Sequence, residues 1–142
     1  MDEECRRITR HRVIVFRERR SSATFRNPQA LEFITSKIDG CLLKEVRACD
    51  WALSQANNGD VLIELKGRDV DHALEQISET AEFWWNSCYR NGRLAFLIVC
   101  RQYPGVDTRV QRAKQRFARL YRAPLHVNSR NREYDFEVVL SF

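Results

Sequence analysis

Two acidic residues and one lysine, Asp50, Glu64 and Lys66, form the set that this sequence singles out for chemistry. Carboxylate oxygens are the ligands that Mg²⁺ prefers, and Mn²⁺ accepts the same donors. An ion held between the two carboxylates would polarise a phosphoryl oxygen and lower the pKa of its bound water. A lysine beside it would orient the attacking water and stabilise charge on the phosphate. The set predicts metal-dependent hydrolysis of phosphodiester bonds, with DNA expected before RNA as the substrate.

The alternation of side chains around this set predicts how the chain assembles it. In the segments 47–55 and 60–66, apolar residues occupy odd positions, so the even positions of Asp50, Glu64 and Lys66 lie on the other face of each strand. A turn between the two segments predicts a hairpin, which places Asp50 opposite or diagonal to Glu64 with Cβ atoms within roughly 5 to 8 Å. Carboxylates this close repel unless a cation separates them or one is protonated. The alternative is a solvated sheet face with ordinary surface charges.

The elements that position these residues follow from periodicity and capping signals. Helices are expected over 28–37, 70–88 and 108–121. Strands are expected over 38–43, 47–55, 60–66, 94–100, 125–128 and 134–142. The apolar run Leu94–Cys100 is typical of a strand buried on both faces and paired in parallel with an earlier one. The sequence therefore predicts an α/β domain over 27–142, with a mixed central sheet flanked by helices, a C-terminal helix and two added strands.

The motif and its surroundings resemble the PD-(D/E)XK nuclease superfamily, which includes many restriction enzymes and Holliday-junction resolvases. The resemblance is carried by Asp50, a loop, the strand that holds Glu64 and Lys66, and the helix that follows. It implies a restriction-endonuclease-like core with the order α-β-β-β-α-β over about 28–100. The chain departs from the family pattern at Cys49, where many members have proline. The segments around Asp39 and Asp50 are also similar to uncharacterised small bacterial and phage proteins.

The resemblance also implies a role for each residue of the site. The implied metal ligands are Asp50, Glu64 and the carbonyl of Leu65, and the implied catalytic lysine is Lys66. Some branches of the superfamily add an acidic metal ligand on the first helix, for which Glu32 is the candidate. Some also carry a glutamine on the helix after the lysine, a position that Gln76 fits.

A stripe of four arginines forms a second candidate region. Arg109, Arg112, Arg116 and Arg119 recur at intervals of three, four and three, so they share one face of the helix expected over 108–121. Guanidinium groups stacked in this way repel unless anions neutralise them, and a nucleic-acid backbone would supply such anions. The alternative is an exposed basic face that serves solubility.

The bulk composition is that of one globular domain with a basic surface. The chain has 142 residues, a net charge of +5 and a sequence pI near 9.2, and 20 of its 24 basic residues are Arg. The guanidinium group binds phosphate bidentately, so this bias favours a phosphate-rich partner. Two other functions stay open: a catalytically inactive nucleic-acid-binding protein of the same fold, and a protein-interaction module with a basic face. A homodimer is a further expectation, because cutting both strands of a duplex takes two active centres.

The cysteines and the N-terminal segment give weaker signals. The five cysteines are odd in number, lack zinc-type spacing and follow no leader or long apolar stretch, so we expect reduced thiols in a cytoplasmic protein without membrane association. Cys41 and Cys49 are expected to be small core residues. The segment 1–26 is rich in arginine around the short run Val13–Phe16, a possible strand. It is either a solvated basic tail or an arm that contacts nucleic acid.

Overall fold

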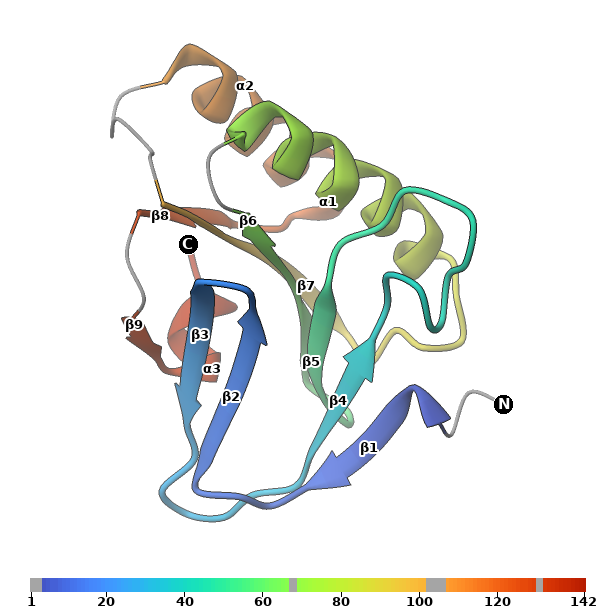
Figure 1. The fold of residues 1–142 in the computed structure, drawn as a ribbon, viewed down its shortest axis with the longest axis vertical. Coiled ribbons are helices and arrows are strands. Elements are labelled where there is room, and N and C mark those ends of the chain that lie inside the picture. The colour runs from blue at the N-terminus through green and yellow to red at the C-terminus, as the bar shows by residue number, and fades with distance from the viewer. Residues whose placement is uncertain (1–3, 67–68, 102–106, 130–131) are drawn as a thin grey trace.

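The computed structural model describes residues 4–66, 69–101, 107–129 and 132–142, which form two sheets and three helices (Figure 1). The strands are β1 Arg6–Thr9, β2 Val13–Glu18, β3 Ser21–Arg26, β4 Phe33–Lys37, β5 Trp51–Gln55, β6 Gly59–Lys66, β7 Arg93–Cys100, β8 Leu125–Asn128 and β9 Arg132–Tyr134. The helices are α1 Val70–Trp85, α2 Thr108–Tyr121 and α3 Phe136–Val139.

The larger sheet has six strands in the order β1-β4-β5-β6-β7-β8. The pairs from β1 to β6 are antiparallel, whereas β6 pairs in parallel with β7, and β7 with β8. The run Leu94–Cys100 is buried along its whole length, because layers cover both faces of β7. The expected α/β class with a mixed sheet is confirmed, as is the parallel pairing of this buried strand.

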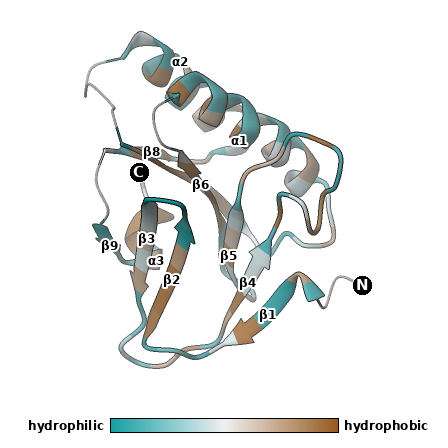
Figure 2. Cartoon of the chain, in the orientation of Figure 1, coloured by the Kyte–Doolittle hydropathy of each residue, from teal (hydrophilic) through white to brown (hydrophobic). Residues whose placement is uncertain are grey.

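Helices α1 and α2 cover one face of the large sheet (Figure 1). Asp69 caps α1 by accepting a hydrogen bond from the backbone N–H of His72 at 3.1 Å, and Asp107 caps α2 in the same way. Hydrophilic and hydrophobic residues are interspersed along both helices, as expected for amphipathic helices with one polar and one apolar face (Figure 2). Their buried residues, including Ile77, Trp84 and Phe117, pack on the sheet in one hydrophobic cluster.

A small sheet of order β2-β3-β9 and the short helix α3 cover the other face. Alternation along β2 buries Ile14 and Phe16 and leaves Val13 and Val15 exposed. The ring of Phe16 packs against that of Trp51 in the large sheet, with centroids 5.5 Å apart. The expectation of a sheet flanked by helices is therefore confirmed for one face only, because strands make most of this second layer.

The helix predicted over 28–37 is wrong. Asn27 closes a turn there, since its side-chain Oδ1 accepts from the N–H of Leu31 and its Nδ2 donates to the carbonyl of Leu31. The chain then enters β4, which is paired on both sides, with β1 and with β5. Two ladders of backbone hydrogen bonds outweigh the weak helical spacing of the apolar residues.

Two predicted strands also need correction. The segment 38–43 forms a turn with a single bridge between Asp39 and Leu43 instead of a strand. At the C-terminus, β9 ends at Tyr134, and Asp135 caps α3 by accepting from the N–H of Val138. The order β-β-β-α-β is present from β4 to β7, but no helix precedes it among the described residues 4–32.

The N-terminal segment is folded where the structure describes it. Strand β1 pairs with β4, and β3 pairs in parallel with β9. A disulfide joins Cys5 to Cys41, so the expectation of a reduced, core-packed Cys41 is wrong, whereas Cys49 is a buried free thiol as expected. None of the helices in the described ranges is long and apolar enough to cross a membrane.

Candidate functional site

Asp50 and Glu64 face each other at the end of the β5–β6 pair. The antiparallel register pairs Trp51 with Ile63, so the next position places Asp50 opposite Glu64, as the alternation of side chains predicted. The N–H of Asp50 donates to Glu64 Oε1 at 3.1 Å, and the N–H of Leu65 donates to Asp50 Oδ2 at 2.8 Å. Each carboxylate thus has one oxygen fixed by the backbone of the opposite strand.

Both carboxylates are buried, with exposed fractions of 9% for Asp50 and 1% for Glu64. Burial raises the pKa of Asp50 from its usual 3.8, and the negative charge of Glu18 raises it further, against the opposing effects of the Leu65 N–H and Lys37. Burial also raises the pKa of the neighbouring Cys49 thiol, and the negative charge of Glu64 raises it further. Two buried acidic groups side by side make a site where added positive charge is favourable.

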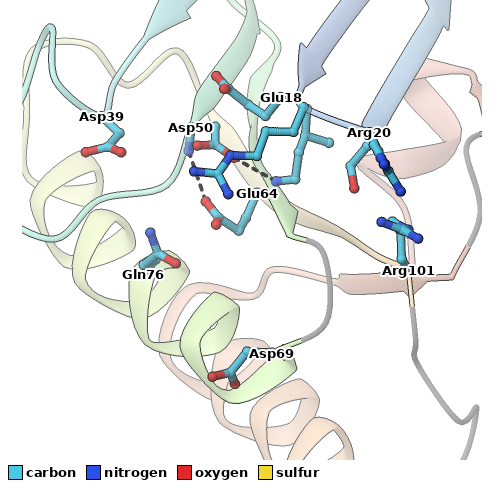
Figure 3. A pocket seen from close by; sticks show the side chains of 11 residues that line it. Glu18, Arg20, Asp39, Asp50, Glu64, Asp69, Gln76 and Arg101 are labelled. Carbon is cyan, nitrogen blue, oxygen red and sulfur yellow. Dashed lines mark hydrogen bonds between the residues drawn. The ribbon is translucent and has the colours of Figure 1, made fainter.

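The carboxylates line a cavity of about 640 Å³ at the ends of β5 and β6, here called the strand-end cavity (Figure 3). Leu65 and Gln76, two further residues that the sequence singled out, also line it. Gln76 extends from α1, and its Nε2 donates to the carbonyl of Ala48 at 3.1 Å. Its Oε1 is buried and has no hydrogen-bond partner among the residues that the structure describes. A buried acceptor of this kind is costly unless a ligand satisfies it.

Three further carboxylates line the cavity, those of Glu18, Asp39 and Asp69, and the sequence did not predict Glu18 there. Glu18 is the last residue of β2, and its Oε1 accepts from Lys37 Nζ at 2.6 Å. Lys37 ends β4 and also lies over the ring of Trp51, 4.9 Å from its centroid. The only sequence signal was the apolar run Val13–Phe16, which predicts a strand but not where the strand packs. The contact joins positions 19 residues apart on different sheets.

The structure describes only the backbone of one residue implied by the family resemblance, and it places another residue away from the cavity. Lys66 is the last residue of β6, paired with Cys100, but its side chain lies outside the part of the chain that the structure describes. Glu32 is exposed and forms an ion pair with Arg10 at 3.1 Å. Glu32 lies just before β4, and Lys37 at the other end of that strand contacts Glu18 of the cavity, so roughly 15 Å of chain separates Glu32 from the site. The expectation that Glu32 joins the metal ligands is therefore wrong.

The acidic pair fits a hard cation in donor chemistry. Asp50 and Glu64 supply carboxylate oxygens, and Gln76 supplies a buried amide oxygen in the same cavity. Mg²⁺ accepts one or two carboxylates and fills its other positions with water. Over the described residues, however, no group of three or more His, Cys, Asp or Glu side chains is arranged to hold a metal ion. Any such site would therefore depend on the pair and on neutral oxygen donors.

The arginine stripe of α2 lies elsewhere, beside a groove of about 590 Å³ between α1 and α2, here called the interhelical groove. Arg109 forms ion pairs with Asp71 and, at 2.8 Å, with Asp107. Hydrogen bonding from Arg109 lowers the pKa of Asp107. Arg116 donates to Ser78 Oγ at 2.5 Å. Two of the four arginines are thus neutralised or bound within the protein.

The remaining pair of the stripe, Arg112 and Arg119, is exposed. Arg112 lines the interhelical groove opposite acidic residues of α1, Glu75 and Glu79. The repulsion expected within the stripe is therefore relieved in part by carboxylates of this chain. In comparisons with known proteins, no protein-family model matches the sequence, and no curated protein or solved structure matches it significantly.

Proposed function

We propose that this protein is a metal-dependent nuclease that hydrolyses phosphodiester bonds, with DNA as its expected substrate. One observation supports this most: the facing, buried carboxylates of Asp50 and Glu64 line an open cavity. Two like charges held together at this depth destabilise the fold unless a cation or a proton compensates them. Proteins retain such arrangements mainly at functional sites.

In this proposal Asp50 and Glu64 hold Mg²⁺ or Mn²⁺, and the carbonyl of Leu65 and Oε1 of Gln76 offer further oxygen donors. A bound ion would polarise the phosphoryl oxygen and acidify its water. Lys66, on the same strand as Glu64, would orient the attacking water and stabilise charge on the phosphate. Hydrogen bonds from opposite strands to Asp50 and Glu64 keep both carboxylates in place without movement of the chain. The restriction-endonuclease-like core belongs to the same proposal, supported by the order β4-β5-β6-α1-β7.

A cleavage assay tests this function. Purified protein is incubated with single-stranded, duplex and branched DNA and with RNA, in Mg²⁺, Mn²⁺ or EDTA. We expect cleavage in either ion, none in EDTA, and a loss of at least about a hundredfold for Asp50→Asn. Asp71→Asn is the matched control, because it removes one carboxylate from the interhelical groove and should leave the rate unchanged. Absence of cleavage with every substrate, or equal rates for Asp50→Asn and the wild type, contradicts the proposal.

A catalytically inactive nucleic-acid-binding protein of the same fold is the second candidate. It is favoured by the absence, within the described ranges, of a three-residue metal-ligating group. Such a protein would bind nucleic acid equally well in EDTA, with a steep dependence on salt, and would take up no Mg²⁺ in calorimetry. The nuclease instead predicts Mg²⁺ uptake that Asp50→Asn abolishes.

A further inference from the structure

The strand-end cavity is divided by charge. In Figure 3, Asp39, Asp50 and Glu64 lie on one side of it, whereas Arg20 and Arg101 lie on the other and point toward each other. Two guanidinium groups that converge in one cavity repel, and an anion between them relieves the repulsion. The cavity therefore has an acidic side suited to a cation and a basic side suited to an anion.

The basic side is built from two separate elements. Glu18 pairs with Ser21, so Arg19 and Arg20 are the two residues of the turn between β2 and β3. Arg19 has a φ of 53°, a left-handed conformation that such turns usually give to Gly or Asn. Arg101 directly follows β7. Arginine is thus used where local backbone preference favours smaller residues, and all three arginines line the cavity.

We propose that Arg20 and Arg101 form a phosphate-binding subsite for the backbone of a nucleic-acid strand. The planar guanidinium fork binds phosphate bidentately, and two forks from different elements can hold one phosphate from two directions. The subsite lies in the same cavity as the acidic pair, so a strand bound here passes beside Asp50 and Glu64. The identity of the ligand rests on the proposed function, because phosphate of nucleic acid is what a nuclease must hold.

This proposal places the phosphate contacts in the strand-end cavity, whereas the sequence predicted them on α2. Arg109 is held by two carboxylates and Arg116 by Ser78, and the groove beside them is lined by acidic residues of α1. A strand placed along α2 would have to break these contacts. The turn between β2 and β3 lines the strand-end cavity together with the acidic pair of the proposed reaction site.

Binding of a fluorescein-labelled single-stranded oligonucleotide, measured by anisotropy in Ca²⁺, tests this subsite. Ca²⁺ takes oxygen ligands like Mg²⁺, and a gel run in parallel verifies that the strand stays intact. The double variant Arg20→Gln with Arg101→Gln should raise the Kd about tenfold and lower the slope of log Kd against log salt by about 1.4, for two lost phosphate contacts. Arg20→Lys with Arg101→Lys should recover part of the affinity.

The matched control is the double variant Arg112→Gln with Arg119→Gln, which removes the same charge from α2. It should change the Kd less than about twofold. Circular dichroism and the melting midpoint verify that each variant is folded. The inference is overturned if wild-type protein does not bind the strand at low salt, or if the two double variants weaken binding equally. Failure of the nuclease proposal looks different: the strand binds through Arg20 and Arg101, but Mg²⁺ and Mn²⁺ support no cleavage.

Discussion

The strand-end cavity and the interhelical groove both bring acidic residues and arginines together, but they balance the charges in opposite ways. In the groove, Arg109 forms ion pairs with Asp71 and with Asp107, the residue that caps α2. In the cavity, Asp50 and Glu64 are buried next to each other, and Arg20 and Arg101 lie apart from them on the far side. The groove thus places opposite charges next to each other, whereas the cavity places like charges next to each other.

The pKa shifts of two aspartates express this difference. Burial raises the pKa of Asp50, so its ionised form costs the folded state free energy. Hydrogen bonding from Arg109 lowers the pKa of Asp107, so its ionised form stabilises the fold. A stripe of arginines therefore says little about ligand binding until its partners are known. Grouped like charges in a cavity are the stronger sign of a binding site.

The largest effect on the free energy of unfolding is expected from loss of the disulfide, which lies in the chain segment leading to the cavity and not in α1 or α2. Cys5–Cys41 closes a loop with a sequence separation of 36 and ties β1 to the segment that leads to Asp50. Replacing both cysteines by serine should cost about 3 to 4 kcal/mol and lower the melting midpoint by about 10 °C. Hydrogen exchange should speed up over 38–50 and stay unchanged in α1 and α2. Three free thiols are expected in the unreduced, denatured protein, and five would contradict the disulfide.

The next effect is stabilisation by a divalent ion. Mn²⁺ at about a hundred times its Kd should stabilise the folded wild-type protein by about 2.7 kcal/mol. Differential scanning calorimetry should show the higher melting midpoint in wild-type protein and in Asp71→Asn, but not in Glu64→Gln. Equal stabilisation of all three proteins would place the ion outside the cavity. It would contradict the conclusion that the cavity, and not the groove, is the binding site.

The smallest effect is a pair of opposite pH dependences, measured by thermal unfolding in EDTA. The folded pKa of Asp50 is raised, so its contribution to stability falls as pH rises from 3.8 through the folded value. Asp50→Asn removes that loss and should raise the melting midpoint at neutral pH by about 2 to 4 °C. The folded pKa of Asp107 is lowered, so its contribution is present above 3.8 and is lost as pH falls through the folded value.

Asp107→Asn should therefore destabilise the protein at neutral pH and have little effect in strong acid. The two variants serve as controls for each other, since each replaces one aspartate by its neutral isostere. If both substitutions lowered the melting midpoint at neutral pH, the ionised form of Asp50 would stabilise the fold as that of Asp107 does. The expected contrast between the cavity and the groove would then be wrong.

The acidic pair was predictable because it depends on local rules. Alternation of period two and a short hairpin turn are enough to set Asp50 opposite Glu64. The amphipathic pattern of α1 and α2 and the apolar run of β7 are equally local, and these elements were found at nearly their observed bounds.

The parts that the sequence did not reveal depend on contacts between distant segments. Strand β4 has helical spacing of its apolar residues, and only pairing with β1 and β5 makes it a strand. Glu18 and Arg20 reach the cavity because the β2–β3 sheet packs across the large one. Arg109 looked available for phosphate because its partner Asp71, 38 residues earlier on another helix, cannot be assigned by periodicity. Long-range packing therefore decided which charged residues belong to the site.

Anomalous diffraction from crystals soaked in Mn²⁺ tests the central claim most directly. The account predicts one strong peak between the carboxylates of Asp50 and Glu64, with oxygen ligands at about 2.1 Å, and no peak there in crystals of Asp50→Asn. A wild-type crystal with no peak in the cavity, or with its peak in the interhelical groove beside Asp71 and Glu75, would contradict it.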